Sequence, residues 1–214
     1  MLNVNVSGDF ETHIMVRSCD GERLAELRDW SARRALKFVH IVLDRGLSPS
    51  QPMISLAGQG TIADQLAAAE QICGELATVG FQATRIKVEA SPFNPGVPQS
   101  DVDAPTDDER YFEHHIKLLL EAEKDLSGFA HVLIPHTAHL SKNALRMRHD
   151  GQQERFVTQR CFRVGRSSAQ QWLDALLREI KALGLPMIEV EEEFVVYDSN
   201  LKVDAGWISA EETR

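Results

Sequence analysis

The stretch that decides the fold reads Tyr111-Phe112-Glu113-His114-His115-Ile116-Lys117. A closely similar stretch stands 102 residues earlier and reads Phe10-Glu11-Thr12-His13-Ile14-Met15-Val16-Arg17. In both stretches apolar and polar side chains alternate, which is the pattern of a half-buried β-strand. The repetition predicts a chain built from two similar halves.

The first half continues with a regular succession of strand and helix patterns. We expect strands at 9–17, 38–43, 53–57 and 84–90, and helices at 21–36 and 61–79. Thr61 and Asp64 have the spacing of a helix N-cap, and Gly80 suits the left-handed residue that ends a helix. The order β-α-β-β-α-β is that of a ferredoxin-like unit.

The second half predicts the same order with a shortened first helix. We expect a strand at 111–120, a short helix at 122–127, a strand at 129–135, a polar connection at 136–153, a strand at 155–164, a helix at 167–183 and a strand at 187–198. Residues 92–110 carry four prolines and five acidic residues, a composition that is typical of a linker. The predicted fold is therefore α+β, a tandem duplication of ferredoxin-like units at 1–91 and 111–214.

Composition excludes several classes of function. The 214 residues carry a net charge of −9, which argues against nucleic-acid or anionic-membrane binding. No apolar run approaches the length of a membrane span, and no secretory leader is recognisable. Three cysteines without CxxC spacing are typical of reduced thiols. We expect a cytoplasmic protein.

The repeated Glu-x-His pairs are the candidate site. If Phe10, Ile14 and their counterparts face the helices, the Glu-x-His faces point the other way and can meet between the halves. The expected catalytic residues come from both pairs: Glu11, His13, Glu113 and His115. The expected ligand-binding residues are basic or imidazole side chains on neighbouring strands: His40, His131, Arg17, Lys117 and Arg160.

Three chemistries remain open for this site. In the first, the histidines act as general acid and base on a small anionic molecule, for example a phosphorylated one, held by the basic residues. In the second, Glu11, His13, Glu113 and His115 bind a divalent metal, the one cofactor that the residues suggest. In the third, the protein binds a ligand without catalysis or forms a homodimer through an edge strand or open sheet face.

The chain resembles two known enzyme families only in general features. A duplicated α+β chain with a histidine in each half is similar to the two-histidine phosphoesterases, but their His-x-Thr/Ser signature is absent. The acidic run Ile188–Glu193 resembles the alternating glutamates of triphosphate tunnel enzymes, yet it stands near the other end of the chain and lacks the lysines. The chain also has no Walker, GxGxxG, GxSxG or HExxH motif. We assign it to none of these families.

Overall fold

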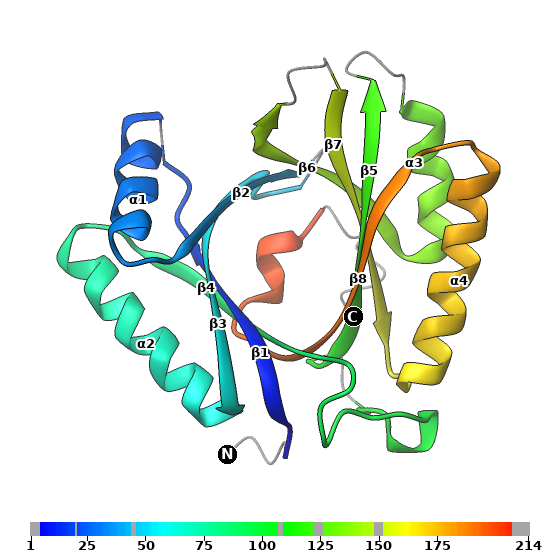
Figure 1. Ribbon diagram of the computed structural model, residues 1–214, viewed down its shortest axis with the longest axis horizontal. Coiled ribbons are helices and arrows are strands. Elements are labelled where there is room, and N and C mark those ends of the chain that lie inside the picture. Colours follow the sequence, from blue (N-terminus) through cyan, green and yellow to red (C-terminus); the bar gives the residue numbers. More distant parts are fainter. Residues whose placement is uncertain are drawn as a thin grey trace.

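A computed structural model describes residues 5–19, 21–43, 46–106, 109–121, 126–147 and 152–206; of residue 127 and residues 143–147 it describes the backbone alone. The fold is mixed α/β with antiparallel strand pairing, as the alternating patterns predict (Figure 1).

The first half forms one four-stranded antiparallel sheet with two helices. Its elements are β1 (Ser7–Val16), α1 (Gly21–Arg33), β2 (Lys37–Leu43), β3 (Ser50–Thr61), α2 (Ile62–Thr78) and β4 (Ala83–Ala90). The strands pair in the order β4-β1-β3-β2. The predicted capping box is present, because the Thr61 and Asp64 side chains each accept from the other's backbone N–H. Gly80 follows α2 with φ of 79°, a conformation that favours glycine.

The second half repeats this element order and pairing. Its elements are β5 (Tyr111–Glu121), α3 (Ser127–Leu133), β6 (Ala138–Met147), β7 (Gln152–Phe162), α4 (Arg166–Ala182) and β8 (Met187–Asp198). The strands pair in the order β8-β5-β7-β6. As expected, its first helix is short, with 7 residues in α3 against 13 in α1.

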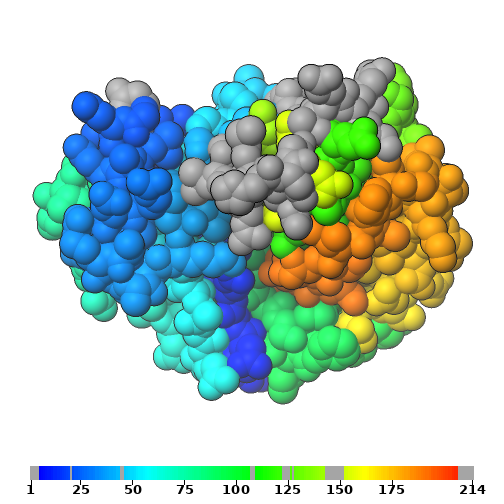
Figure 2. Space-filling model, turned by 45° about the horizontal axis from the view of Figure 1, so that its top comes forward, coloured from blue at the N-terminus to red at the C-terminus, as the bar shows by residue number. Residues whose placement is uncertain are grey.

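The two sheets join at both edges into one closed barrel. Strand β4 pairs with β8, and β2 pairs with β6, so the order closes as β1-β3-β2-β6-β7-β5-β8-β4. Helices α1 and α2 flank the barrel on one outer side, and α3 and α4 flank it on the other (Figure 1). In the space-filling view the first half, in blue and cyan, and the second half, in green to orange, meet along the middle of the molecule (Figure 2). Closure turns one face of every strand toward a shared interior.

The outward faces of the strands carry the hydrophobic cores. Ile14 packs with Leu27 and Leu76 beneath α1 and α2, and Ile116 packs with Leu173 and other residues of α4. All five side chains are at most 1% exposed. The expected division of faces is therefore confirmed, because the apolar side chains of the repeated stretches lie under the helices and the Glu-x-His side chains face the barrel interior.

Two expectations for the second half were wrong. The predicted strand at 129–135 is mostly helix α3, followed by a 3-10 turn at Ile134–His136. The predicted polar connection at 136–153 contains strand β6. A short apolar run does not by itself distinguish strand from buried helix, which explains the first error. Residues 122–125 of the predicted short helix lie outside the described residues.

The last segment that the structure describes lies inside the barrel. After β8 the chain turns back into the interior and forms the 3-10 helix η3 (Leu201–Asp204), seen in salmon at the centre of Figure 1. A hydrogen bond from the Leu47 N–H to the Ala205 carbonyl, 2.9 Å long, holds its end. None of the helices in the described ranges has the length and apolar character needed to cross a membrane.

Candidate functional site

The barrel interior encloses a cavity of about 310 Å³. Its wall has two different parts. The apolar part comes mainly from β1, β2 and β3 with one residue of β7: Met15, Phe38, Val39, Ile41, Leu43, Met53 and Phe156. The charged part comes mainly from β4, β5, β7 and β8, and it includes Lys87, Glu113, His115, Arg160 and Glu193. Such a cavity offers both an apolar surface and ionised groups to a small molecule.

His115 sits in the charged wall as a cation. Its Nδ1 lies 3.1 Å from Thr158 Oγ1, and its Nε2 lies 3.2 Å from Glu113 and 3.4 Å from Glu193. Burial opposes protonation, but the hydrogen bonds and attraction of the two carboxylates outweigh it and raise the pKa of His115 to about 10. At neutral pH this imidazole is therefore a proton donor and a positive charge, not a general base.

His13 occupies the corresponding place in the first half. Its Nδ1 lies 2.7 Å from Ser55 Oγ on β3, and its Nε2 lies 2.6 Å from Glu89 Oε2 on β4. The strand register places Ser55 opposite His13 as it places Thr158 opposite His115. Both repeated histidines are thus oriented by a hydroxyl on one neighbouring strand.

Glu113 is the most strongly paired carboxylate of the repeated stretches. It is 1% exposed and accepts from Arg160 Nε at 2.5 Å and from Lys87 Nζ at 2.6 Å. Burial alone would raise the pKa of its carboxyl, but Arg160 and Lys87 hold that pKa well below its usual range. Glu11 differs, because its contact with Lys37, at 3.1 Å, is exposed at the rim.

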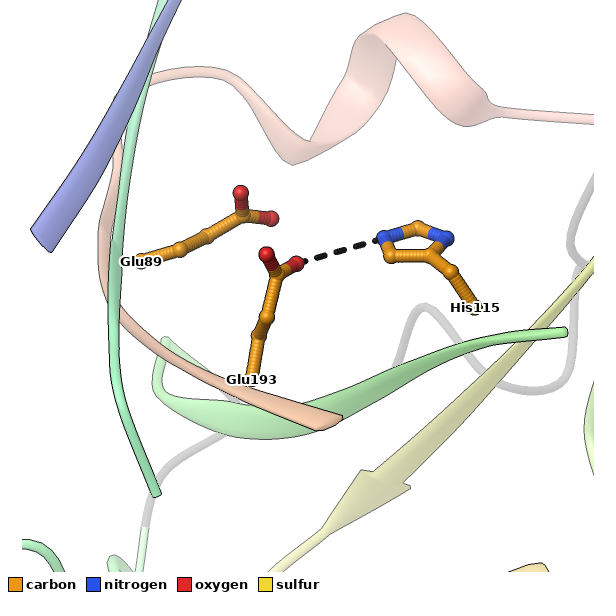
Figure 3. A group of neighbouring side chains, drawn as sticks. All are labelled: Glu89, His115 and Glu193. Carbon is orange, nitrogen blue, oxygen red and sulfur yellow. Dashed lines mark ion pairs between the residues drawn. The ribbon is translucent and has the colours of Figure 1, made fainter. Parts of the chain in front are cut away.

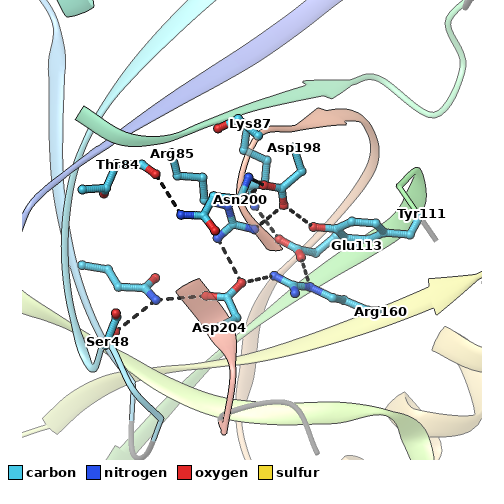
Figure 4. A network of polar contacts seen from close by, with 12 residues as sticks. Ser48, Thr84, Arg85, Lys87, Tyr111, Glu113, Arg160, Asp198, Asn200 and Asp204 are labelled. Carbon is cyan, nitrogen blue, oxygen red and sulfur yellow. Dashed lines mark hydrogen bonds and ion pairs between the residues drawn. The ribbon is translucent and has the colours of Figure 1, made fainter. Parts of the chain in front are cut away.

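A second buried network surrounds Asp204 of η3 (Figure 4). Its Oδ2 accepts from Arg85 at 3.0 Å and from Arg160 at 2.8 Å, and its Oδ1 accepts from Gln51 at 3.0 Å. Burial raises the pKa of Asp204, but the two arginines outweigh it and lower the pKa to about 2. Asp198 also binds Arg85 and accepts from the Tyr111 hydroxyl.

Glu89, His115 and Glu193 form the tightest group of metal-ligand type among the described residues (Figure 3). One ligand atom of each lies within 4.8 Å of the others. Burial and the charge of Glu89 raise the pKa of Glu193, against the opposing effect of His115. Burial also disfavours the Glu89 carboxylate, but Lys87 and His13 lower its pKa. Two neighbouring carboxyl groups thus have pKa values shifted in opposite directions.

The charges of this interior nearly cancel. Within the described ranges, the carboxylates of this network are Glu89, Glu113, Glu193, Asp198 and Asp204, and the cations that contact them are Arg85, Lys87, Arg160 and His115. With all five carboxylates ionised and all four cations charged, this network carries one excess negative charge. Of the basic residues predicted to hold an anion, Arg160 already contacts Glu113 and Asp204, and Lys117 already contacts Glu189.

The sequence-predicted residues divide into two sets. Glu11, His13, Glu113, His115, Lys117 and Arg160 line the cavity together. His40, Arg17 and His131 are placed elsewhere. His40 turns to the other face of β2 and contacts Ser50 Oγ at 2.9 Å, Arg17 follows β1 and is exposed, and His131 is exposed on α3. The expectation that His131 lies on a strand was therefore wrong.

Several interior residues were missed by reasoning from the sequence. Arg85, Lys87 and Glu89 alternate along β4, so the alternation already predicted for 84–90 carried a usable signal. Glu193 could have been found in the same way on β8. Asp204 had no such signal, because it comes from an irregular segment beyond the last strand.

Comparison with known proteins adds little. No family model matches the chain, and no curated protein matches it. Among solved structures, the small subunit of acetolactate synthase from Thermotoga maritima is 11% identical, with 87% of this chain and 94% of that chain covered and a TM-score of 0.30. Chlorite dismutase from Candidatus Nitrospira defluvii is 15% identical, with 88% and 91% covered and a TM-score of 0.29. Similarity this low has no bearing on ligand or activity.

Proposed function

We propose that the barrel interior binds a small molecule that has one ionised group and an apolar body. The observation that carries this proposal is the division of the cavity wall, with apolar side chains of β1, β2 and β3 facing charged side chains of β4, β5 and β8. The cavity, at about 310 Å³, is at the lower end of the range for small-molecule sites. The apolar body would displace water from the apolar part of the wall, and the ionised group would contact the charged part.

We take the ionised group to be anionic, for example a carboxylate or a phosphate. In support, Arg85 and Arg160 already hold one carboxylate in this interior, that of Asp204. Against it stands the near-neutral charge of the wall, because an arriving anion has to replace a resident one. The sign of the charge on the bound group is therefore tested directly with anionic, neutral and cationic ligands.

A matched series of benzene derivatives tests both parts. Calorimetry should detect phenyl phosphate and benzoate, benzyl alcohol should bind less tightly, and benzylamine least. Tighter binding of benzylamine than of phenyl phosphate and benzoate would overturn the anionic assignment. No binding of any of the four compounds would overturn the proposal that the cavity binds a small molecule. Val39→Trp should abolish binding by filling the cavity, while Val190→Trp, on an exposed part of β8, is the control.

Acid-base chemistry on the bound molecule stays part of this proposal. His115, with a pKa of about 10, would act as the proton donor or as a fixed positive charge. Glu193 would accept a proton more readily than Glu113, because the pKa of Glu193 is raised and that of Glu113 is lowered. The proposed general base is therefore a glutamate, whereas the sequence predicted a histidine.

A divalent cation at Glu89, His115 and Glu193 is the second candidate, because their ligand atoms lie within 4.8 Å of one another. Zinc or manganese would accept this combination of imidazole and carboxylates, after His115 loses its proton. Titration with Zn²⁺ should then release protons, and Glu193→Gln should abolish the binding that Glu191→Gln leaves in place. Binding that survives Glu193→Gln would exclude this site.

Three further features remain proposals. We infer that residues 1–91 and 111–214 derive from one duplicated ferredoxin-like unit, joined by a linker at 92–110, because both halves have the same element order and strand pairing. A cytoplasmic location and a homodimer are proposed from the sequence alone.

A further inference from the structure

We propose that Arg85 and Arg160 form an oxyanion-binding site, which the chain's own Asp204 carboxylate fills, and that the carboxylate or phosphate of a ligand takes the place of Asp204. The inference depends on the proposed function, since it names where the ionised group of the ligand binds. It also assigns η3 a role as an internal ligand that competes for the site.

The contacts of Asp204 are those of a bound anion. Two guanidinium groups donate to the same oxygen, from 3.0 Å and 2.8 Å, and a side-chain amide donates to the other. The arginine side chains are 5% exposed, so water competes little for them. Paired guanidinium groups are well suited to carboxylate and phosphate oxygens, because their N–H groups are planar and form several hydrogen bonds at once.

The arginines are held in position independently of Asp204. Arg85 Nε donates to Asp198 at 2.8 Å, and Arg160 Nε donates to Glu113 at 2.5 Å. Both carboxylates lie on strands of the barrel wall, β8 and β5 (Figure 4). Departure of Asp204 would therefore leave two buried guanidinium groups that Asp198 and Glu113 still orient. Such preorganisation favours binding of a replacement anion.

Asp204 differs from the other four carboxylates of the cluster in how it is attached. Glu89, Glu113, Glu193 and Asp198 belong to barrel strands, whereas Asp204 belongs to the four-residue helix η3. Few backbone hydrogen bonds hold this segment, among them Val203 N–H to Asn200, Ala205 N–H to Lys202 and Leu47 N–H to Ala205. Opening a short irregular segment costs less free energy than opening a strand ladder. Asp204 is thus the carboxylate of the cluster that an arriving anion can replace at the lowest cost.

The position of Asp204 joins this site to the cavity. Asp204, Arg85 and Arg160 line the same cavity as Val39 and Met53 of the apolar wall. A ligand whose anionic group replaced the Asp204 carboxylate would keep its apolar body within the enclosed space. The alternative is a permanent structural ion pair, in which Asp204 fixes the arginines and never leaves.

Phosphate binding to the intact chain and to Asp204→Asn distinguishes these alternatives. The asparagine keeps the shape of the side chain but not its charge, so the arginines hold it less tightly. Calorimetry with inorganic phosphate should show binding at least about ten-fold tighter in Asp204→Asn than in the wild type, because a competing group lowers apparent affinity by the fraction of time it fills the site. Asp174→Asn, which removes one exposed carboxylate on α4, should leave the affinity unchanged. Equal affinity in the wild type and Asp204→Asn would overturn the proposal.

Two further experiments show where the anion binds and whether the site takes carboxylates or phosphates. Arg160→Gln in the Asp204→Asn background should abolish the tight phosphate binding. Acetate in place of phosphate should bind more tightly to Asp204→Asn than to the wild type if the site takes carboxylates, whereas an effect with phosphate alone assigns it to phosphate esters. Phosphate binding that survives Arg160→Gln would place the anion elsewhere and overturn the proposal.

Hydrogen exchange on the wild-type protein avoids dependence on any variant. Saturating phosphate should accelerate exchange of the Val203 and Ala205 amides, while ladder amides of β4 and β7 stay protected. Phosphate binding without faster exchange at η3 would show that Asp204 remains in place. If the benzene derivatives bind while η3 stays docked, the proposed cavity stands and this inference alone fails.

Discussion

His13 and His115 occupy matching positions in the two halves of the barrel, but their surroundings differ. Each Nδ1 lies beside a hydroxyl, Ser55 Oγ or Thr158 Oγ1, and each Nε2 lies beside a carboxylate. The difference is in the glutamate two residues earlier. Glu113 is buried between Arg160 and Lys87, whereas Glu11 meets the exposed Lys37.

One register position explains this difference. Strand pairing places Arg160 opposite Glu113 and Ala57 opposite Glu11. A buried carboxylate requires a charged or hydrogen-bonding partner. Arg160 supplies one for Glu113, whereas Ala57 supplies none for Glu11, which therefore lies at the rim of the cavity. Two nearly identical sequence stretches thus gain different electrostatic roles from their neighbours across the sheet.

The largest expected effect is on stability. Glu113→Ala should lower the free energy of unfolding by about 3–5 kcal/mol, because it leaves Arg160 and Lys87 without a shared carboxylate in the interior. Glu11→Ala, at the matching position, should cost at most about 1 kcal/mol, since its ion pair is exposed. Urea denaturation followed by circular dichroism measures both. Equal losses would show that the two halves do not differ as described.

Between pH 6 and pH 10, the pH dependence of stability should include a contribution from His115. The pKa of His115 in the fold, about 10, exceeds its ordinary value of 6.5, so its stabilising contribution is complete below about pH 6.5 and is lost as the pH rises to 10. Urea midpoints between pH 6 and pH 10 should fall less in His115→Gln than in the wild type. Parallel curves for the wild type and His115→Gln would contradict the assignment.

The smallest expected effect concerns His40. It contacts Ser50 on the outer side of the barrel wall, and burial lowers the pKa of its imidazole, so it is neutral at pH 7. The variant His40→Gln should cost roughly 1 kcal/mol of stability, the value of a neutral hydrogen bond, and leave phenyl phosphate affinity unchanged. For comparison, His115→Gln should weaken that affinity roughly ten-fold or more by removing a charged donor. A loss of affinity in His40→Gln would mean that the cavity extends beyond the wall described.

Strand alternation and helix ends were the features that the sequence predicted well. The repeated stretches, the Thr61 cap and the glycine after α2 are local signals, because they depend on residues that are close together in the sequence. The region of α3 and β6 was misread for a physical reason. Its apolar run carries no helical period. The polar residues of β6 are typical of a loop when the strand pairing is unknown, although one of them, Ser141, lines the cavity.

The candidate site was predictable only in part. Glu113, His115 and Arg160 could be identified because repetition and alternation marked them. Their partners Lys87 and Asp204 depend on closure of the barrel and on the return of η3 into it, which are long-range events. The raised pKa of His115 also depends on Glu193, 78 residues away in the chain. Nothing in the local sequence encodes that contact.

The most direct test of the central proposal follows the imidazole signals of His115 and His13 by nuclear magnetic resonance during titration with phenyl phosphate. If the barrel interior is the binding site, the His115 signals should shift saturably in the wild type and in Val190→Trp, but stay unchanged in Val39→Trp. No saturable shift of either histidine in the wild type, or the same shift in a folded Val39→Trp variant, would contradict the account.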